Sequence, residues 1–413
     1  MILCVMRIPP DLNGHGGSQR AWQLVQALQR LAPVHFVLVS RRVDTDANTV
    51  SLEPLRPLVE SVTSVDIPEW QPFSAERLPT AMRKLHTGWI DLAGMRSQEA
   101  PRLSAAALAA IADQLPVRRA RLAFAGRLPS AVIIDQLAAG GGLQVDHKVV
   151  DFDDVMSTFR RRQLASSDAV KGIQSRALTR IDTRLIERAE KQVARSWDAV
   201  SVCKAEDVEL LRSAHTDARV LNVPNVISRP RLADRKRNGP VELLFVGNLS
   251  FQPNVQGLLV FLNEAWPRVR RELDARLSVV GLNPQPEVRA ACAEADVELQ
   301  ANVPDLEPYY QRSDIVVAPI LFGGGTRIKI LEAMAYGRAV VSTPMGAEGL
   351  GIVSGRHALL AEDMSGFAEA VIALGTDADL RTRIAEQARQ LQQTAFGFSA
   401  MAEAVERMVS PYL

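Results

Sequence analysis

The sequence is poor in cysteine, and Cys4, Cys203 and Cys292 are its only three among 413 residues. Their number is odd, they lie far apart, and none belongs to a C-x-x-C pair or a Cys/His cluster. This spacing argues against a disulfide framework and against a zinc site, because both need several cysteines at short intervals. We predict buried, reduced thiols and a reducing compartment.

An excess of charge of one sign is also absent, since 48 lysines and arginines balance 47 aspartates and glutamates. The balance gives no global basic field, and we expect no nucleic-acid partner. No apolar run reaches the roughly 20 residues that cross a bilayer. The longest alanine-rich run, 103–115, carries Asp113, and the apolar start, 1–6, ends at Arg7 with no basic residue before it. We therefore expect a cytoplasmic protein that begins with a strand and not with a signal peptide.

The composition that remains is typical of a folded protein, with 47% hydrophobic and 23% charged residues. A chain of 413 residues is too long for one ordinary core, so we expect two domains of roughly 200 residues each. Residues 229–240 have little apolar content and form the predicted linker. It divides a first domain, 1–228, from a second, 241–395, and we expect a final helix, 396–413, to pack back on the first domain.

Short apolar runs alternate with amphipathic stretches in both halves, which is typical of parallel strands joined by helices. The predicted fold class is therefore α/β, with two Rossmann-like domains. The strands predicted for the first domain are 2–6, 34–39, 61–67, 131–135, 148–152, 199–203 and 219–223, with helices at 18–31, within 75–121 and at 173–195. Those predicted for the second domain are 241–246, 276–281, 297–299, 314–320 and 339–342.

The most informative segment is 318–337, where a glycine run joins two apolar strands through a three-turn helix. Gly323, Gly324 and Gly325 lack a Cβ and allow the backbone to turn sharply close to a ligand. Thr326 is the predicted N-cap of the helix. The free amides at a helix start attract a phosphate group, and the segment therefore predicts an anion site.

Two cations, Arg327 and Lys329, occupy the first turn of this helix, where positive charge opposes the helix dipole. Their position indicates a bound anion. Lys329 and Glu332 share one face at a spacing of three, and a carboxylate one turn inward can accept both hydroxyls of a ribose. The alternative is an ordinary loop-helix crossover with two surface cations.

The segment resembles the nucleotide-sugar site of the retaining GT-B glycosyltransferases of group 1, also called family 4. The most similar subgroup is bacterial and associated with exopolysaccharide assembly. The resemblance covers most of the chain and includes the runs 243–254, 277–281, 303–309, 323–335 and 340–349, and more loosely 16–17, 199–203 and 223–225.

The resemblance implies two Rossmann-like domains that face a cleft, with the acceptor on the first and a nucleoside-diphosphate sugar on the second. The implied reaction is transfer of a hexosyl unit, with retention of configuration, to a saccharide or lipid-linked acceptor, without a metal or other cofactor. The implied donor-binding residues are Gly16, Gly17, Asn248, Gly323, Gly324, Gly325, Thr326, Arg327, Lys329 and Glu332.

The chain departs from the family pattern at the donor site. The family has two glutamates with seven residues between them; Glu332 matches the second, but Gly324 stands at the first. Many members also carry a basic pair after the first strand of the second domain, where this chain has Asn248 and Asn254. We infer that the two cations of the helix supply the missing positive charge.

Acidic residues of the first domain are the remaining catalytic and metal candidates. Asp135 stands where the family has a histidine; we expect it to end a strand beneath the transferred sugar, as the candidate catalytic residue. Asp151-Phe-Asp-Asp154 resembles the aspartate pair by which another glycosyltransferase fold holds a metal. We reject a metal site, because a third ligand is lacking and salt bridges to 160–162 explain the aspartates.

Two arginine clusters of the first domain could meet anionic lipid. One contains Arg118, Arg119, Arg121 and Arg127, interleaved with Leu122 and Phe124, and the other is Phe159-Arg-Arg-Arg162. We expect peripheral contact with the inner membrane surface, and the alternative is a solvated face.

Two rival functions stay open. One is a nucleotide-sugar epimerase on the same fold, which product analysis separates from a transferase. The other is a catalytically silent glycosyltransferase-like subunit, suggested by the missing carboxylate at Gly324.

Overall fold

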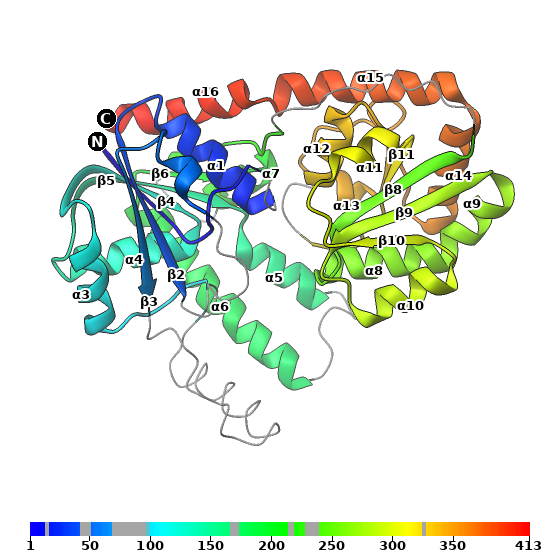
Figure 1. Cartoon of the computed structure of the whole chain (residues 1–413). Coiled ribbons are helices and arrows are strands. Elements are labelled where there is room, and N and C mark those ends of the chain that lie inside the picture. Colours follow the sequence, from blue (N-terminus) through cyan, green and yellow to red (C-terminus); the bar gives the residue numbers. More distant parts are fainter. Residues whose placement is uncertain are drawn as a thin grey trace. The chain divides into compact units, whose positions relative to one another are not determined.

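The computed structural model describes residues 1–12, 16–41, 51–67, 97, 99–165, 173–213, 219–227, 239–323 and 328–413. The chain divides into two compact units, one of Met1–Pro224 with Met401–Leu413 and one of Asn225–Ala400. Each has a parallel sheet with helices packed against it (Figure 1). The fold is therefore α/β in both units. The junction at Pro224 lies close to the expected end of the first domain, residue 228.

The first unit contains a seven-stranded sheet in the order β3-β2-β1-β4-β5-β6-β7. All its pairings are parallel, with Ile2 opposite Val34 and Leu122 in the two neighbouring strands. The order reverses beside β1, where parallel sheets open a crevice at their carboxyl edge. Its strands are β1 (Ile2–Met6), β2 (Val34–Arg41), β3 (Ser61–Ile67), β4 (Arg119–Gly126), β5 (Gln144–Asp153), β6 (Ala199–Val202) and β7 (Arg219–Asn222).

One strand predicted for this unit was wrong. Residues 131–135 lie in helix α4 (Leu128–Ala139). The strand of this region is β4, which begins at the end of the stretch 75–121 predicted to contain helices. A short apolar run cannot tell a buried strand from a buried helix, and Pro129 favours a helix start here. The other helices are α1 (Gly16–Leu28), α3 (Ala105–Gln114), α5 (Met156–Ala165), α6 (Ile173–Ser196) and α7 (Ala205–Ser213).

The second unit contains a six-stranded parallel sheet in the order β10-β9-β8-β11-β12-β13. Its strands are β8 (Val241–Asn248), β9 (Ala275–Leu282), β10 (Glu298–Ala301), β11 (Ile315–Ala318), β12 (Ala339–Ser342) and β13 (Leu359–Leu360). Its helices are α8 (Gln252–Val260), the π-turn η5 (Phe261–Ala265), α9 (Trp266–Glu272), α10 (Pro286–Glu294), α11 (Glu307–Arg312), α12 (Ile328–Ala335), α13 (Pro344–Ala347), α14 (Met364–Thr376) and α15 (Ala378–Ala395).

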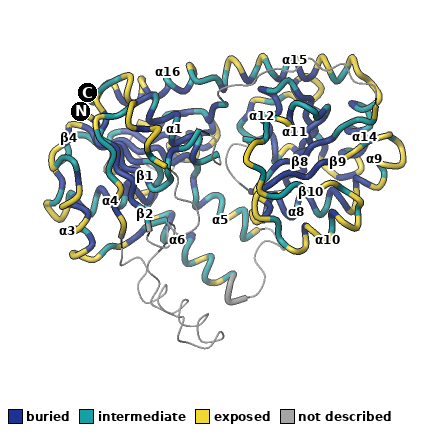
Figure 2. Tube along the Cα trace, viewed as in Figure 1, coloured by how far each residue is buried: buried dark blue, intermediate teal, exposed yellow. Residues whose placement is uncertain are grey.

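Both faces of the second sheet are buried. Leu243 and Phe245 pack in one hydrophobic cluster, with α8, α9 and α14, while Leu244 and Val246 pack in another, with α12. Successive side chains of a strand point to opposite faces, so the alternation requires helices on both sides. Figure 2 shows the buried strands inside each unit and the exposed outer faces of the helices.

The end of the chain belongs to the first unit. Helix α16 (Phe398–Val409) buries Met401 and Met408, and the residues from Met401 onward group with that unit. The Tyr412 hydroxyl donates to the Asp198 carbonyl at 3.0 Å, and its ring lies 5.2 Å from that of His147. Among the described residues, no helix combines the length and the apolar character needed to cross a bilayer.

Candidate functional site

Helix α12 follows strand β11 at the carboxyl edge of the second sheet. The turn between them begins with Gly323, whose φ of 125° lies in the region that favours glycine. Gly324, Gly325, Thr326 and Arg327 lie outside the described residues. The part of this predicted site that can be described therefore consists of Gly323 and the helix from Ile328 onward.

Lys329 lies in the first turn of α12 and is 9% exposed. Its Nζ donates to Asn254 Oδ1 at 2.7 Å and lies 4.6 Å from the centroid of the Phe245 ring. Asn254 Nδ2 in turn donates to the Asn248 carbonyl at 2.9 Å, so the ammonium is held at the carboxyl end of β8. The Asn248 side chain itself accepts bonds from Ser250 Oγ and from the Ser250 amide. The structure thus brings together Lys329, Asn254 and Asn248, which the sequence analysis had singled out separately.

Two glycines leave room for this arrangement. A Cβ added to Gly281 would lie 1.9 Å from the Gly247 carbonyl oxygen. A Cβ added to Gly247 would lie 2.8 Å from Asn254 Nδ2 and 3.0 Å from Lys329 Nζ. The contact at Gly281 is with backbone and excludes any side chain, whereas a Cβ at Gly247 would displace the ends of the Asn254 and Lys329 side chains. The end of β8 is therefore shaped around the lysine.

Glu332 lies one turn beyond Lys329 and is half-buried. Its Oε2 accepts a 2.7 Å hydrogen bond from the hydroxyl of Tyr310, a residue of α11 that has no exposed surface. Burial, with the nearby Glu332 charge, raises the pKa of Tyr310 well above its usual value, so the phenol stays a donor. Tyr336 stacks on Tyr310 with ring centroids 4.9 Å apart, and burial raises its pKa to about 12.

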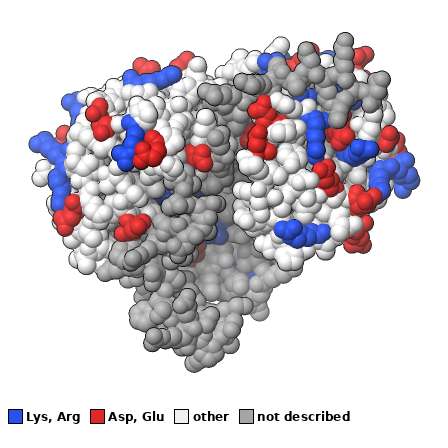
Figure 3. All heavy atoms as spheres, in the orientation of Figure 1, with Lys and Arg blue, Asp and Glu red and all other residues white. Residues whose placement is uncertain are grey.

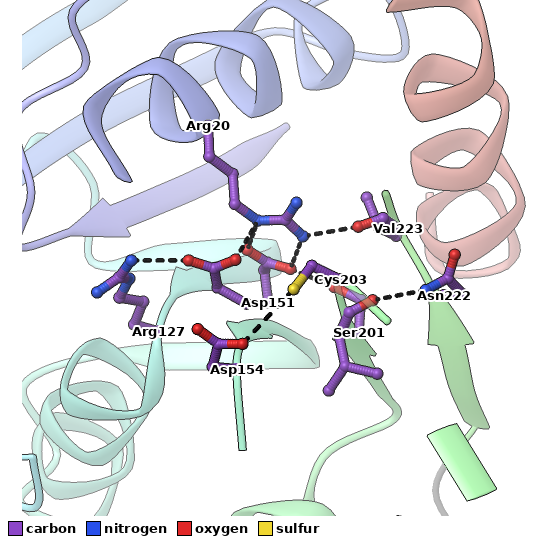
Figure 4. A network of polar contacts seen from close by, with 10 residues as sticks. Arg20, Arg127, Asp151, Asp154, Ser201, Cys203, Asn222 and Val223 are labelled. Atoms are coloured by element: carbon purple, nitrogen blue, oxygen red, sulfur yellow. Dashed lines mark hydrogen bonds and ion pairs between the residues drawn. The ribbon is translucent and has the colours of Figure 1, made fainter. Parts of the chain in front are cut away.

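A second polar cluster lies at the carboxyl edge of the first sheet (Figure 4). Arg20, in the first turns of α1 just after Gly16 and Gly17, donates through Nε and Nη2 to the two carboxylate oxygens of Asp151, at 2.8 and 2.6 Å. Nη2 also donates to the Val223 carbonyl at 2.9 Å. Both charges are buried, and the bidentate geometry offsets their desolvation. This pair ties α1 to the ends of β5 and β7.

The rest of the cluster surrounds a bulge at the end of β5. Arg127 (φ 70°) and Asp153 (φ 63°) both adopt the left-handed region, and Arg127 Nη2 donates to Asp153 Oδ2 at 2.7 Å. Burial, with the charge of Asp153, raises the pKa of the neighbouring Asp154 to about 6. No group of three or more His, Cys, Asp or Glu side chains that could hold a metal is found within the described residues. Asp151 and Asp153 pair with Arg20 and Arg127. The expectation that arginines 160–162 hold these aspartates was therefore wrong, since Arg160 and Arg161 pair with acids of α6.

Asp135 does not end a strand. It lies in α4, where its carboxylate accepts from Lys148 Nζ at 2.9 Å and from Trp197 Nε1 at 3.1 Å. The expectation that placed it beneath a transferred sugar rested on the strand assignment that was wrong. The residue that directly follows β4 is Arg127.

The two arginine clusters differ from the sequence expectation. Leu122 and Phe124 have no exposed surface, because β4 is a central strand and both side chains face the core. They cannot provide apolar anchors beside the arginines, and that part of the expectation was wrong. Arg118 pairs with Asp113, and Arg160 and Arg161 pair with acids of α6. Figure 3 shows positive and negative side chains intermixed on the visible face.

Sequence reasoning missed two residues of these clusters. Arg20 follows the glycine pair that was singled out, but its partner Asp151 lies 131 residues away. Tyr310 directly follows the run 303–309 that carried the resemblance. The sequence gave no signal of its contact with Glu332. Pair contacts of this kind have no local pattern, since they depend on which elements pack together.

Two Rossmann-like units with parallel sheets define the GT-B class of fold. The structure is similar to sucrose-phosphate synthase from Thermosynechococcus elongatus, with a TM-score of 0.70 and 14% identity over 99% of this chain and 98% of the other. It is also similar to Anabaena HepE in complex with UDP-glucose, with a TM-score of 0.63 and 12% identity over 100% of both chains. At such identities the similarity establishes the fold.

The sequence of the second unit is similar to a known family. Residues 240–377, which include β8, α11 and α12, match the family described as glycosyl transferases group 1. A curated relative is the uncharacterized 44.6 kDa protein in the cps region of Klebsiella pneumoniae, 34% identical over 139 residues. That match covers 32% of this chain and 36% of the relative, so it spans little more than a third of the relative's length.

Proposed function

We propose that this protein transfers a hexosyl unit from a nucleoside-diphosphate sugar to an acceptor hydroxyl, with retention of configuration. One observation carries the proposal. Within the segment that matches the group 1 family, the buried ammonium of Lys329 and the carboxylate of Glu332 lie one turn apart on α12, beside Asn248 and Asn254. The cation would bind the diphosphate of the donor, and the carboxylate would accept hydrogen bonds from the ribose joined to it.

The donor would be held by the second unit. The amides of the turn from Gly323 and the first turn of α12, with Lys329, would bind the diphosphate. Glu332 would accept the ribose hydroxyls. We place Gly324, Gly325, Thr326 and Arg327 in the same site, on the sequence argument alone. In the first unit, Gly16 and Gly17 begin α1, and the amides at this helix start would suit an anionic group.

The chemistry requires stabilisation of a leaving group. The bond between the anomeric carbon and the diphosphate breaks, and the diphosphate leaves with the electron pair. The acceptor oxygen bonds to the same face of that carbon, and its hydroxyl proton passes to the departing diphosphate oxygen. A buried cation and helix amides stabilise the charge that develops there. No metal is needed in this scheme, because Lys329 and Arg327 replace the basic pair whose positions are taken by Asn248 and Asn254.

The position of Lys329 supports this replacement. Its ammonium reaches the Asn254 side chain, so its positive charge stands at the end of β8 although it comes from α12. A cation in the first turn of a helix is otherwise unfavourable. An anionic ligand would remove that cost.

We also propose a lipid-linked or polysaccharide acceptor and peripheral contact with an anionic membrane. The cations suited to this contact lie on α6. Arg180, Arg184, Arg188, Lys191 and Arg195 are exposed and recur every three or four residues, which puts them on one face of the helix. They span about 22 Å at the rise of an α-helix, and each basic residue near an anionic leaflet contributes about 1 kcal/mol.

The test is a donor and product analysis with the purified protein. Thermal-shift screening against a panel of nucleotide-sugars identifies the donor. Incubation of that donor with candidate acceptors, followed by NMR of the anomeric proton, reports transfer and its stereochemistry. Donor conversion to an epimer without transfer would favour the epimerase, and binding without donor hydrolysis would favour the silent subunit.

A further inference from the structure

A short hydrogen bond to the proposed ribose-binding carboxylate comes from outside its own helix. The Tyr310 hydroxyl donates to Glu332 Oε2 at 2.7 Å and lies 3.4 Å from the Lys329 carbonyl oxygen. A single phenol of α11 therefore contacts α12 at the Glu332 carboxylate and at the Lys329 backbone, two of the residues proposed to bind the donor. Tyr310 and Glu332 are 22 residues apart in sequence.

The Tyr310 ring is held firmly. It has no exposed surface, and Tyr336 stacks on it with an angle of 8° between the ring planes. The Tyr310 carbonyl accepts from Ser313 Oγ at 2.9 Å, which fastens the end of α11. The hydroxyl is thus presented from a rigid site, whereas Glu332 is half-buried and has three rotatable side-chain bonds.

We propose that Tyr310 is a positioning residue, which holds the Glu332 carboxylate in the orientation that accepts the ribose hydroxyls of the donor. The inference rests on the proposed function. An ionised carboxylate offers about four acceptor sites on its two oxygens, so the bond from Tyr310 leaves capacity for a ribose. By selecting one rotamer in advance, the phenol reduces the conformational freedom that Glu332 loses on binding.

A packing role alone predicts a different outcome. A phenylalanine has the same ring and would fill the same space against Tyr336. If Tyr310 only fills the core between α11 and α12, loss of the hydroxyl changes stability but not selectivity for the ribose. If it positions Glu332, its loss weakens only those ligands that carry ribose hydroxyls.

The experiment compares Tyr310→Phe with Tyr309→Phe by calorimetry. Tyr309 is the matched control, since it is the adjacent residue and its ring lies 4.7 Å from the Arg312 guanidinium. The probes are UDP, ADP and GDP and their 2′,3′-dideoxy forms, which lack both ribose hydroxyls. Thermal unfolding of each variant confirms that it is folded.

We expect Tyr310→Phe to bind the ribose form roughly 2- to 12-fold more weakly, because the Glu332 side chain must then be ordered on binding. The dideoxy form should bind both proteins alike, and Tyr309→Phe should match the wild type. Equal weakening of both forms, or no weakening, would overturn the positioning role while leaving the proposed donor site intact. A folded wild type that binds none of the probes would instead overturn the proposed function itself.

A second variant tests the same claim from the other side. Glu332→Asp keeps the charge but withdraws it from the Tyr310 hydroxyl, and it should show the same selective loss for the ribose form. Glu332→Asp is the variant to measure if Tyr310→Phe does not fold. Full affinity of Glu332→Asp for the ribose form would overturn the inference.

Discussion

Replacement of Lys329 by methionine tests the proposed diphosphate site most directly. The change removes one charge from α12 and keeps an unbranched side chain. The ammonium is nearly buried and donates a hydrogen bond of 2.7 Å to Asn254, so little water screens its attraction for an anion. A hydrogen bond between charged groups contributes about 1.5–3 kcal/mol, which corresponds to roughly 10- to 150-fold in affinity for a nucleoside diphosphate.

Calorimetry with a nucleoside diphosphate and with the corresponding nucleoside is the assay. The nucleoside has no phosphate and should lose little affinity. Lys148→Met is the matched control, because it makes the same change in the first unit, where Lys148 pairs with Asp135. If Lys329→Met weakens the nucleoside as much as the diphosphate, or weakens neither, the ammonium does not bind phosphate and the reasoning fails.

Three further predictions concern stability, metal and membrane. Burial raises the pKa of Glu190 to about 7 from its ordinary 4.5, so the folded protein binds a proton that the unfolded chain has released, and stability should fall as pH rises through that window. Glu190→Gln can still accept a hydrogen bond from the Ser157 amide. Its free energy of unfolding should exceed that of the wild type at pH 8, on the order of 2–3 kcal/mol, and equal it at pH 4. A difference in denaturation midpoint that does not change with pH would contradict this. Transfer activity should survive a chelator, and activity lost to the chelator and restored by magnesium or manganese would refute a metal-free scheme. The wild type should sediment with anionic but not neutral liposomes, less so at high salt. Liposome binding should fall more when glutamine replaces three arginines of α6, Arg180, Arg184 and Arg188, than when it replaces the exposed Arg270, Arg271 and Arg276. Equal losses of binding would show that α6 does not form the contact.

Local patterns in the sequence were enough to predict the α/β class and the segment with the proposed chemistry. Alternation of apolar runs and amphipathic stretches reports parallel strands and crossovers directly, because each element must bury a face. The helix after the glycine run was predicted from its own residues, since Lys329 and Glu332 are one turn apart wherever that helix packs. The same reasoning failed at 131–135, where a short apolar run gave no periodicity to separate helix α4 from a strand.

Only the tertiary structure decided which side chains meet. Lys329 contacts Asn254 across 75 residues, and Arg20 contacts Asp151 across 131. These pairs depend on strand order and on the packing of helices against the sheet, neither of which leaves a periodic signal in the sequence. The same holds for Asp135, whose carboxylate is engaged by Lys148 and Trp197 because α4 packs beside β5. The sequence alone thus determined the residue types available at each edge of the sheets, and packing determined which of them share a site.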